Sequence, residues 1–436
     1  MKTISSLLFL LFFSLPAFPQ GSLTPPGAPA PTMKSLDQIE ARKPISSAPF
    51  TISTSGAYYL TANLTVASGN AVTIAASGVS LDLNGFTISS TAMSATGTAI
   101  QINDNLRNIA ISNGFIQSGV TVSGGVFSGS GFASGVNYNS VPPVNVRVAN
   151  VSITGVLSSG VFLVSAPSST IESCTVNTAG NIGLGAVAVR DSVGLNCGGY
   201  GIAGTVVEHC YGTGTSGGSG ISANVVSNSR GDSDSGDGII GGNVINCTGL
   251  TPSGSGTGIN ATNVAGSFGS SSTGKGINAV DVSNSNGQSN GANDGIAADS
   301  ASNCRGDSST GRGLNVRNAE NCRASTNGAN PALNTYTASG CYALNTGTGA
   351  GIFAQGPVMN CYGETNGAGS GISAATATTS YGRSTANGIG LSATIATGCT
   401  GVSNTGTGLS AFIGNSCTGS STSGSPLTVS HPYNMP

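Results

Sequence analysis

The chain has 436 residues, only 7% of them charged, and its formal net charge at pH 7 is −2. Such a balance provides neither a basic field for nucleic acid nor an acidic tail, so it argues against nucleic-acid binding. Glycine supplies 68 residues, but valine and isoleucine are spread through the polar background, which favours an extended β architecture over disorder.

The first residues indicate export. Residues 1–20, "MKTISSLLFLLFFSLPAFPQ", combine one lysine with an apolar run from Leu7 to Phe13 and a later proline. This is the layout of a secretory signal peptide, and the run is too short to span a bilayer. We therefore expect an exported protein, extracellular, at the cell surface or periplasmic, with no transmembrane segment in the mature chain.

The next two segments are short. The proline-rich residues 21–32 predict a stiff linker, and residues 33–48 predict a short capping helix. Apolar and polar residues then alternate in "GAYYLTANLTV" and "AVTIAASGVSLDLNGFTI", as they do in β-strands.

From Tyr200 onward the sequence repeats. An Ile or Leu anchor, nearly always preceded by Gly, returns every 18 to 20 residues, at Ile202, Ile221, Ile239, Ile259, Ile277, Ile296, Leu314, Leu333, Ile352, Ile372, Leu391 and Leu409. A unit of this length cannot bury its apolar face alone, so the pattern predicts a solenoid in which successive coils stack. The glycine before each anchor suggests a position that needs positive φ or close backbone approach.

A second slot lies eight residues after the anchor. It holds Cys in seven copies (Cys210, Cys247, Cys304, Cys322, Cys341, Cys399 and Cys417) and Ser in four others, while Cys361 falls one residue past it. Exchange with serine indicates a small, inward-facing side chain, so a structural ladder of buried free thiols is the preferred interpretation. Disulfides, first between Cys304 and Cys322 or Cys399 and Cys417, are the alternative in an exported protein. Upstream, Cys174 and Cys197 suggest equivalent positions in consecutive wider coils.

The motif "SGVSLDLNGFTI" followed by these Gly-Ile/Cys coils resembles the right-handed parallel β-helix repeat proteins exported by bacteria, of the pectate-lyase-like superfold. The resemblance covers roughly residues 50–430. We expect an all-β fold: one right-handed parallel β-helix over residues 49–430, with coils of about 18–20 residues from about residue 183, wider coils at the N-terminal end, and a tail at 431–436. The superfold includes polysaccharide lyases, glycoside hydrolases, epimerases and adhesins, so it does not fix an activity.

The stretch "RGDSDSGDGII", residues 230–240, carries the densest acidic cluster. By its place in the repeat it is expected to form a solvated corner between coils, as is the second Arg-Gly-Asp at 305–307. Asp232, Asp234 and Asp237 are the candidate ligands if a calcium ion binds there, but their spacing is not that of an EF-hand loop. We otherwise predict no metal site and no cofactor, and an attachment signal is the remaining alternative.

Other polar residues give weaker signals. His209 is expected to point outward and His431 lies in the tail, and neither has an evident acidic partner in the sequence. Asn84 and Asn113 suggest an internal asparagine stack. Tyr200, Tyr211, Tyr362 and Tyr381 fall near related corners and suggest a tyrosine row.

Two function classes remain. The leading hypothesis is a non-catalytic monomeric rod with a structural, adhesive or polysaccharide-contact role, whose partner is an extracellular polysaccharide or a cell-envelope component; we predict no catalytic residues. The alternative is a carbohydrate-active enzyme, a polysaccharide lyase or glycoside hydrolase. That enzyme would need clustered carboxylates under long loops, and the only long candidate loop, residues 120–144, contains no charged residue.

Overall fold

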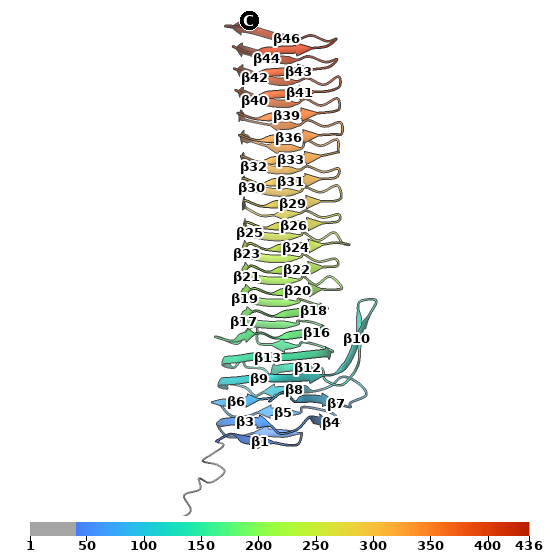
Figure 1. Cartoon of the computed structure of the whole chain (residues 1–436), viewed down its shortest axis with the longest axis vertical. Helices are drawn as coiled ribbons and strands as arrows, with labels where there is room; N and C mark the ends of the chain where they lie inside the picture. Colours follow the sequence, from blue (N-terminus) through green and yellow to red (C-terminus); the bar gives the residue numbers. More distant parts are fainter. Residues whose placement is uncertain (1–40, 436) are drawn as a thin grey trace, which may run out of the picture. The chain divides into compact units, whose positions relative to one another are not determined.

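The computed structural model describes residues 41–435, which lie almost entirely in the compact unit Lys43–Pro436. This unit is a parallel β-solenoid of about 21 turns, and the described residues contain no helix (Figure 1). Its strands form one 44-stranded sheet, in which every pairing is parallel, and a two-stranded antiparallel hairpin. The all-β solenoid expected from the repeat is therefore confirmed.

The strands follow the repeat closely. The less regular N-terminal part contains β1 (Lys43–Ile45), β2 (Phe50–Ile52), β3 (Gly56–Leu60), β4 (Leu64–Val66), β5 (Val72–Ile74), β6 (Val79–Asp82), β7 (Thr87–Ser90), β8 (Thr98–Ile102), β9 (Arg107–Gln117), β10 (Gly119–Ser123), β11 (Val126–Ser130), β12 (Ser134–Tyr138), β13 (Val144–Val156), β14 (Val161–Phe162), β15 (Thr170–Glu172) and β16 (Thr175–Ala179). From residue 184 each coil begins with a stretch of up to seven residues, in β17 (Leu184–Arg190), β19 (Ile202–Glu208), β21 (Ile221–Ser227), β23 (Ile239–Ile245), β25 (Ile259–Ala265), β27 (Ile277–Asn278), β28 (Asp281–Ser283), β30 (Ile296–Ser302), β32 (Leu314–Glu320), β34 (Leu333–Thr335), β35 (Thr337–Ser339), β37 (Ile352–Ala354), β38 (Pro357–Met359), β40 (Ile372–Thr378), β42 (Leu391–Thr397), β44 (Leu409–Asn415) and β46 (Leu427–Tyr433). A shorter strand follows it, in β18 (Val193–Cys197), β20 (Tyr211–Gly214), β22 (Arg230–Ser233), β24 (Thr248–Thr251), β26 (Phe268–Ser271), β29 (Asn286–Ser289), β31 (Arg305–Ser308), β33 (Arg323–Thr326), β36 (Tyr342–Asn345), β39 (Tyr362–Thr365), β41 (Tyr381–Ser384), β43 (Thr400–Ser403) and β45 (Thr418–Ser421).

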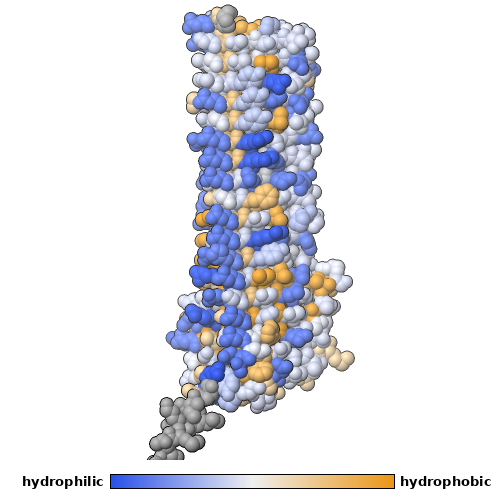
Figure 2. All heavy atoms as spheres, in the orientation of Figure 1, coloured by the Kyte–Doolittle hydropathy of each residue, from blue (hydrophilic) through white to orange (hydrophobic). Residues whose placement is uncertain are grey.

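Each short coil has three paired stretches, here called sides A, B and C. In the coil that starts at Ile221, side A is 221–223, side B is 225–227 and side C is β22. Residue 224 drops out of the pairing, which marks a corner between sides A and B. Outward residues of successive coils therefore stand directly above one another, and Figure 2 shows hydrophilic side chains in rows along the axis of the unit.

The anchors form the main apolar row of the core. Each pairs with the anchor of the next coil, from Ile202 to Leu409, and all twelve are fully buried. The glycine before the anchor does not have positive φ, so the reason for it is close backbone approach. A Cβ on Gly220 would lie 2.4 Å from the backbone nitrogen of Asp232, which belongs to side C of the next coil.

A polar row lies inside side C, which the sequence did not reveal. Ser271 illustrates it: its hydroxyl donates to the carbonyl of Gly256 at 2.7 Å and accepts from the amide of Gly274 at 2.8 Å. These bonds satisfy backbone groups of the turns before the next anchor, which would otherwise be unpaired inside the coil. The same position is buried in most coils and holds Ser, Thr or Asn, at Ser233, Thr251, Ser289, Ser308, Thr326, Asn345, Thr365, Ser384 and Ser403.

The corner between sides B and C repeats a left-handed residue. It has positive φ in every short coil and is usually asparagine or glycine, the residues that adopt this conformation at least cost. Asn84, Asn113 and Asn150 begin this row, and Asn150 Nδ2 donates to Asn113 Oδ1 at 3.2 Å. All three are exposed, so the expectation of an internal stack is wrong: asparagine is selected here for its backbone conformation.

Several predicted boundaries change. The expected signal peptide, the linker and the first half of the helix predicted over residues 33–48 lie outside the described residues, and the second half, residues 41–48, is not helical. At the end of that helix, however, β1 pairs with β3 and places Ile45 beside Leu60 in the core, so the solenoid already begins there. At the other end β46 pairs with β44 and continues to Tyr433, so the residues expected to form a tail extend the sheet.

The N-terminal coils have longer sequence steps. Ile109 pairs with Val146, a step of 37 residues, whereas Ile171 pairs with Val189, a step of 18. Part of the long step is the β10–β11 hairpin, which projects beside the stack in Figure 1. The hairpin is held at its tip, where Ser216 Oγ donates to the carbonyl of Gly125 at 2.9 Å.

Candidate functional site

The Arg-Gly-Asp segments are strands, which corrects the prediction of solvated corners. In β22, Gly231 is buried while Arg230 and Asp232 face outward and form an ion pair, with Nη2 and Oδ2 2.9 Å apart. Tyr211 also donates to Asp232, at 2.9 Å. In β31, Arg305 and Asp307 are paired in the same way. Alternation along a strand puts both charged residues on the same face, two residues apart, so each pair neutralises itself.

The candidate calcium ligands do not converge. Asp232 is occupied by Arg230 and Tyr211, and Asp237 accepts from the Thr257 amide at 2.6 Å and from Asn260 at 3.1 Å. Asp234 lies in the turn after β22. Across residues 41–435, no group of three His, Cys, Asp or Glu residues is placed to hold a metal ion.

A tyrosine row does lie on side C. Tyr342, Tyr362 and Tyr381 occupy one position in successive coils, and adjacent ring centroids are 5.1 Å apart with nearly parallel planes. Tyr211 stands in the same row nearer its N-terminal end, whereas Tyr200 lies outside the row. The rings stack on one another along the axis and Arg323 covers Tyr342. Little ring face therefore remains for a sugar to stack on.

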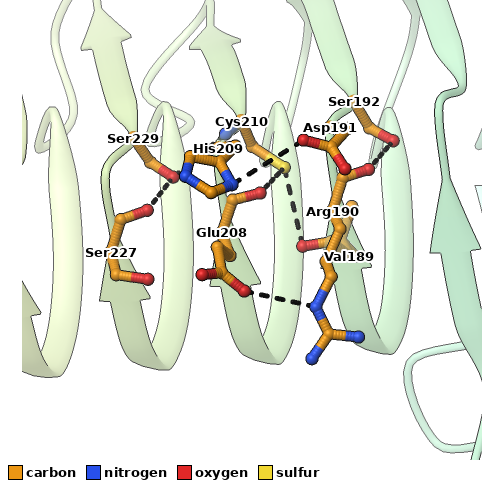
Figure 3. Close-up of polar contacts among 9 residues, drawn as sticks. All are labelled: Val189, Arg190, Asp191, Ser192, Glu208, His209, Cys210, Ser227 and Ser229. Carbon is orange, nitrogen blue, oxygen red and sulfur yellow. Dashed lines mark hydrogen bonds and ion pairs between the residues drawn. The ribbon is translucent and has the colours of Figure 1, made fainter.

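His209 has an acidic partner, contrary to the expectation from sequence. It stands in the left-handed corner row next to Asp191 of the neighbouring coil, with Nδ1 and Oδ1 3.7 Å apart, and both side chains are exposed (Figure 3). Next to them, Arg190 Nε lies 3.3 Å from Glu208 Oε2. The partner was missed because Asp191 belongs to the previous coil, eighteen residues earlier.

The thiol beside His209 is not available as a nucleophile. Cys210 Sγ points inward and donates to the carbonyls of Glu208, at 3.1 Å, and Val189, at 3.6 Å (Figure 3). Burial raises the pKa of the Cys210 thiol to about 11. Because the thiolate is the reactive form, this adjacent His and Cys do not make a nucleophile and base pair.

The cysteine ladder continues further than predicted. In three places the backbone amide of the cysteine donates to the hydroxyl of the serine at the same slot of the next coil: Cys174 to Ser192, Cys210 to Ser229, and Cys247 to Ser267. Cys361 rejoins the row, because the extra residue of its coil is taken up at the corner between sides A and B. Cys197 does not belong to the row: it pairs with Ala179 on side C, so its expected equivalence with Cys174 is wrong. All ten cysteines are buried free thiols in the structure.

The thiol row makes the stability of the rod sensitive to alkali. The pKa of Cys210 is raised to about 11 from 9.0, so between these values the unfolded chain loses a proton that the folded chain keeps. The stability that the protonated Cys210 thiol contributes is complete below pH 9 and is lost as the pH rises through 11; the difference of two pKa units amounts to about 3 kcal/mol. We expect Cys210→Ser, which copies Ser192 and Ser229, to lose less stability than the wild type between pH 8.5 and 11 in urea titrations. Parallel losses in the two proteins would contradict the prediction.

A groove on side A was not anticipated. It has a volume of about 670 Å³ and crosses five coils, bounded by an outward side-A row and by the corner row between sides A and B. The side-A row carries Asn278, Ala297, Asn315 and Asn334, and the corner row carries Asp299, Arg317, Tyr336 and Gln355. At about 4.8 Å per coil, four steps give the groove a length of roughly 19 Å.

The amides of the groove are oriented by a ladder of hydrogen bonds. Asn334 Nδ2 donates to Asn315 Oδ1 at 2.8 Å, and Asn315 Nδ2 donates to Asp294 Oδ2 at 3.0 Å. Asp299 and Arg317, by contrast, are exposed and form no ion pair with any residue between 41 and 435. The groove thus offers oriented amides together with charged groups that are free to bind a ligand.

Sequence reasoning missed this groove because its residues are dispersed over five coils. A signal exists: Asp299, Arg317, Tyr336 and Gln355 each lie three residues after an anchor. They form a column of the repeat in which the residues are large and polar.

Comparison of the chain with protein-family models, with curated proteins and with solved structures found no match. Within residues 41–435, no helix is long and apolar enough to cross a membrane.

Proposed function

We propose that the protein is an exported, non-catalytic rod that binds an extracellular or cell-envelope polysaccharide along its axis. The observation that carries the proposal is the side-A groove, an open polar trough that follows the axis over five coils. A polymer lying in it would meet a new set of groups about every 4.8 Å. Hydroxyl groups would bond to Asn315 and Asn334, whose amides are already oriented, so little side-chain entropy is lost on binding.

The resemblance to right-handed parallel β-helix proteins exported by bacteria supports this proposal, because the pectate-lyase-like superfold includes adhesins and many proteins that act on polysaccharides. The signal-peptide pattern of residues 1–20 agrees with an extracellular ligand.

A second function, cleavage of the polymer, is favoured by one observation. His209 and Asp191 form an exposed pair next to Glu208, and a histidine oriented by a carboxylate is a common general base. Glu208 itself is paired with Arg190.

The test is a panel of neutral and acidic polysaccharides incubated with the protein, with and without calcium, and analysed by gel filtration. We expect co-elution with a polymer whose size does not change. Asn315→Ala/Asn334→Ala should weaken co-elution several-fold, whereas the matched pair Ser392→Ala/Ser410→Ala, which changes the same row outside the groove, should not. No co-elution with any polymer would refute the proposed function. A shortened polymer would show an enzyme, and His209→Ala would then test the alternative.

A further inference from the structure

We infer that the side-A groove takes a neutral glycan and that one sugar ring packs on Tyr336 at its corner. The inference rests on the proposed function and adds to it the class of ligand and the residue that positions it.

The first observation is an exposed aromatic pair. Tyr336 is 51% exposed at the corner, and Phe353 is 39% exposed on side A of the next coil, where it pairs with Asn334. Within residues 41–435, neither ring stacks on another aromatic ring, unlike Tyr342, Tyr362 and Tyr381 of side C. Exposed aromatic surface beside oriented amides combines the apolar and polar contacts that a sugar ring uses.

The second observation is an extra residue in the coil that follows the coil of Tyr336. The coil from Ile352 has an extra residue at its corner, Gln355-Gly356, beside Tyr336. Gly356 donates its amide to the Tyr336 carbonyl at 2.8 Å, and a Cβ on Gly356 would lie 2.8 Å from that carbonyl oxygen and 3.2 Å from Tyr336 Cε1. The insertion therefore brings bare backbone beneath the edge of the ring and leaves the ring exposed.

The charges decide the class of ligand. Asp299 and Arg317 stand on adjacent coils of the same row and have opposite signs, and Lys275, which lies near the end of the groove, bonds to Asn278. In a polymer of uronates or sulfated sugars, successive sugar units carry a negative charge. One of these charges would lie next to Asp299 and be repelled by it. A neutral, polyhydroxylated chain can instead donate to Asp299 and accept from Arg317 without repulsion.

The experiment measures binding of the full chain to dextran, hydroxyethyl cellulose, laminarin and xylan as neutral probes and to polygalacturonate and alginate as acidic ones, by affinity electrophoresis. We expect a neutral probe to bind and Tyr336→Ala to weaken its binding about tenfold. Tyr336→Phe, which keeps the ring, should stay within about twofold of the wild type, and Tyr362→Ala on side C is the matched control.

Gly356→Ala provides a second measurement. A methyl group beneath the ring should displace Tyr336 and weaken the same probe, while circular dichroism shows that the fold is retained.

Binding of a neutral polymer that Tyr336→Ala leaves unchanged would overturn this inference and leave the proposed function standing. Binding of acidic polymers alone would also overturn it. Absence of binding to every polymer would refute the proposed function and this inference together.

Discussion

Replacing Ile296 by alanine is expected to lower the free energy of unfolding by about 3 kcal/mol. Ile296 is fully buried and lies in register between Ile277 and Leu314. Removing its side chain leaves a cavity that the neighbouring coils cannot fill, because each anchor is held in its own rung by backbone pairing. Guanidinium unfolding followed by far-UV circular dichroism measures the loss.

Ile395→Ala is the matched control. Ile395 is also in a strand of the solenoid, but it faces outward on side B and is 39% exposed. The control should cost less than about 1 kcal/mol. Equal losses for the two variants would mean that the anchor row is not the main apolar contribution to the core.

Replacing Gly371 by valine is expected to be at least as damaging, with a loss of about 3 kcal/mol or more. Gly371 precedes the anchor Ile372, and its Cβ would lie 2.3 Å from the backbone nitrogen of Arg383 and 2.5 Å from the carbonyl oxygen of Gly390. Those atoms belong to backbone in sheet pairing, so they cannot move aside without breaking hydrogen bonds. The loss should show as a lower denaturation midpoint.

Two comparisons test whether the loss comes from steric overlap at this position. Thr378→Val places valine at an exposed outward position at the end of β40, the strand that begins right after Gly371, and should change the midpoint little. Gly371→Ala should be intermediate, because Ala332 occupies the equivalent position before Leu333. If Gly371→Val were as stable as Thr378→Val, close backbone approach would not be the reason for this glycine.

The fold could be predicted because the anchors make the repeat visible. Ile or Leu after Gly at constant steps stands out from a background of small polar residues, and burial of that row dictates stacking. The inner row of Ser271 and its equivalents could not be found in this way, since serine and threonine are common at all positions. Cys174 and Cys197 were mispaired because their spacing of 23 residues equals the step of the coil before them, from Val148 to Ile171, whereas the next step is 18.

The groove was harder to predict than the fold. A repeat alignment places Asp299, Arg317 and Tyr336 in one column, but it does not show that this column faces outward at a corner. That position depends on where the strand bends between sides A and B, and the bend follows from pairing between coils. The exposed Tyr336 ring depends in addition on the extra residue at Gln355-Gly356 in the following coil.

The equivalence of the coils also bears on how the chain changes over evolutionary time. Loss of residues 391–408 would join Gly390 to Leu409, recreating the Gly-Leu step found at Gly408-Leu409. Recombination between repeats in the gene can thus add or remove whole rungs while the contacts at each junction stay the same. The length of the rod can vary in this way while the groove between Asn278 and Gln355 is inherited unaltered.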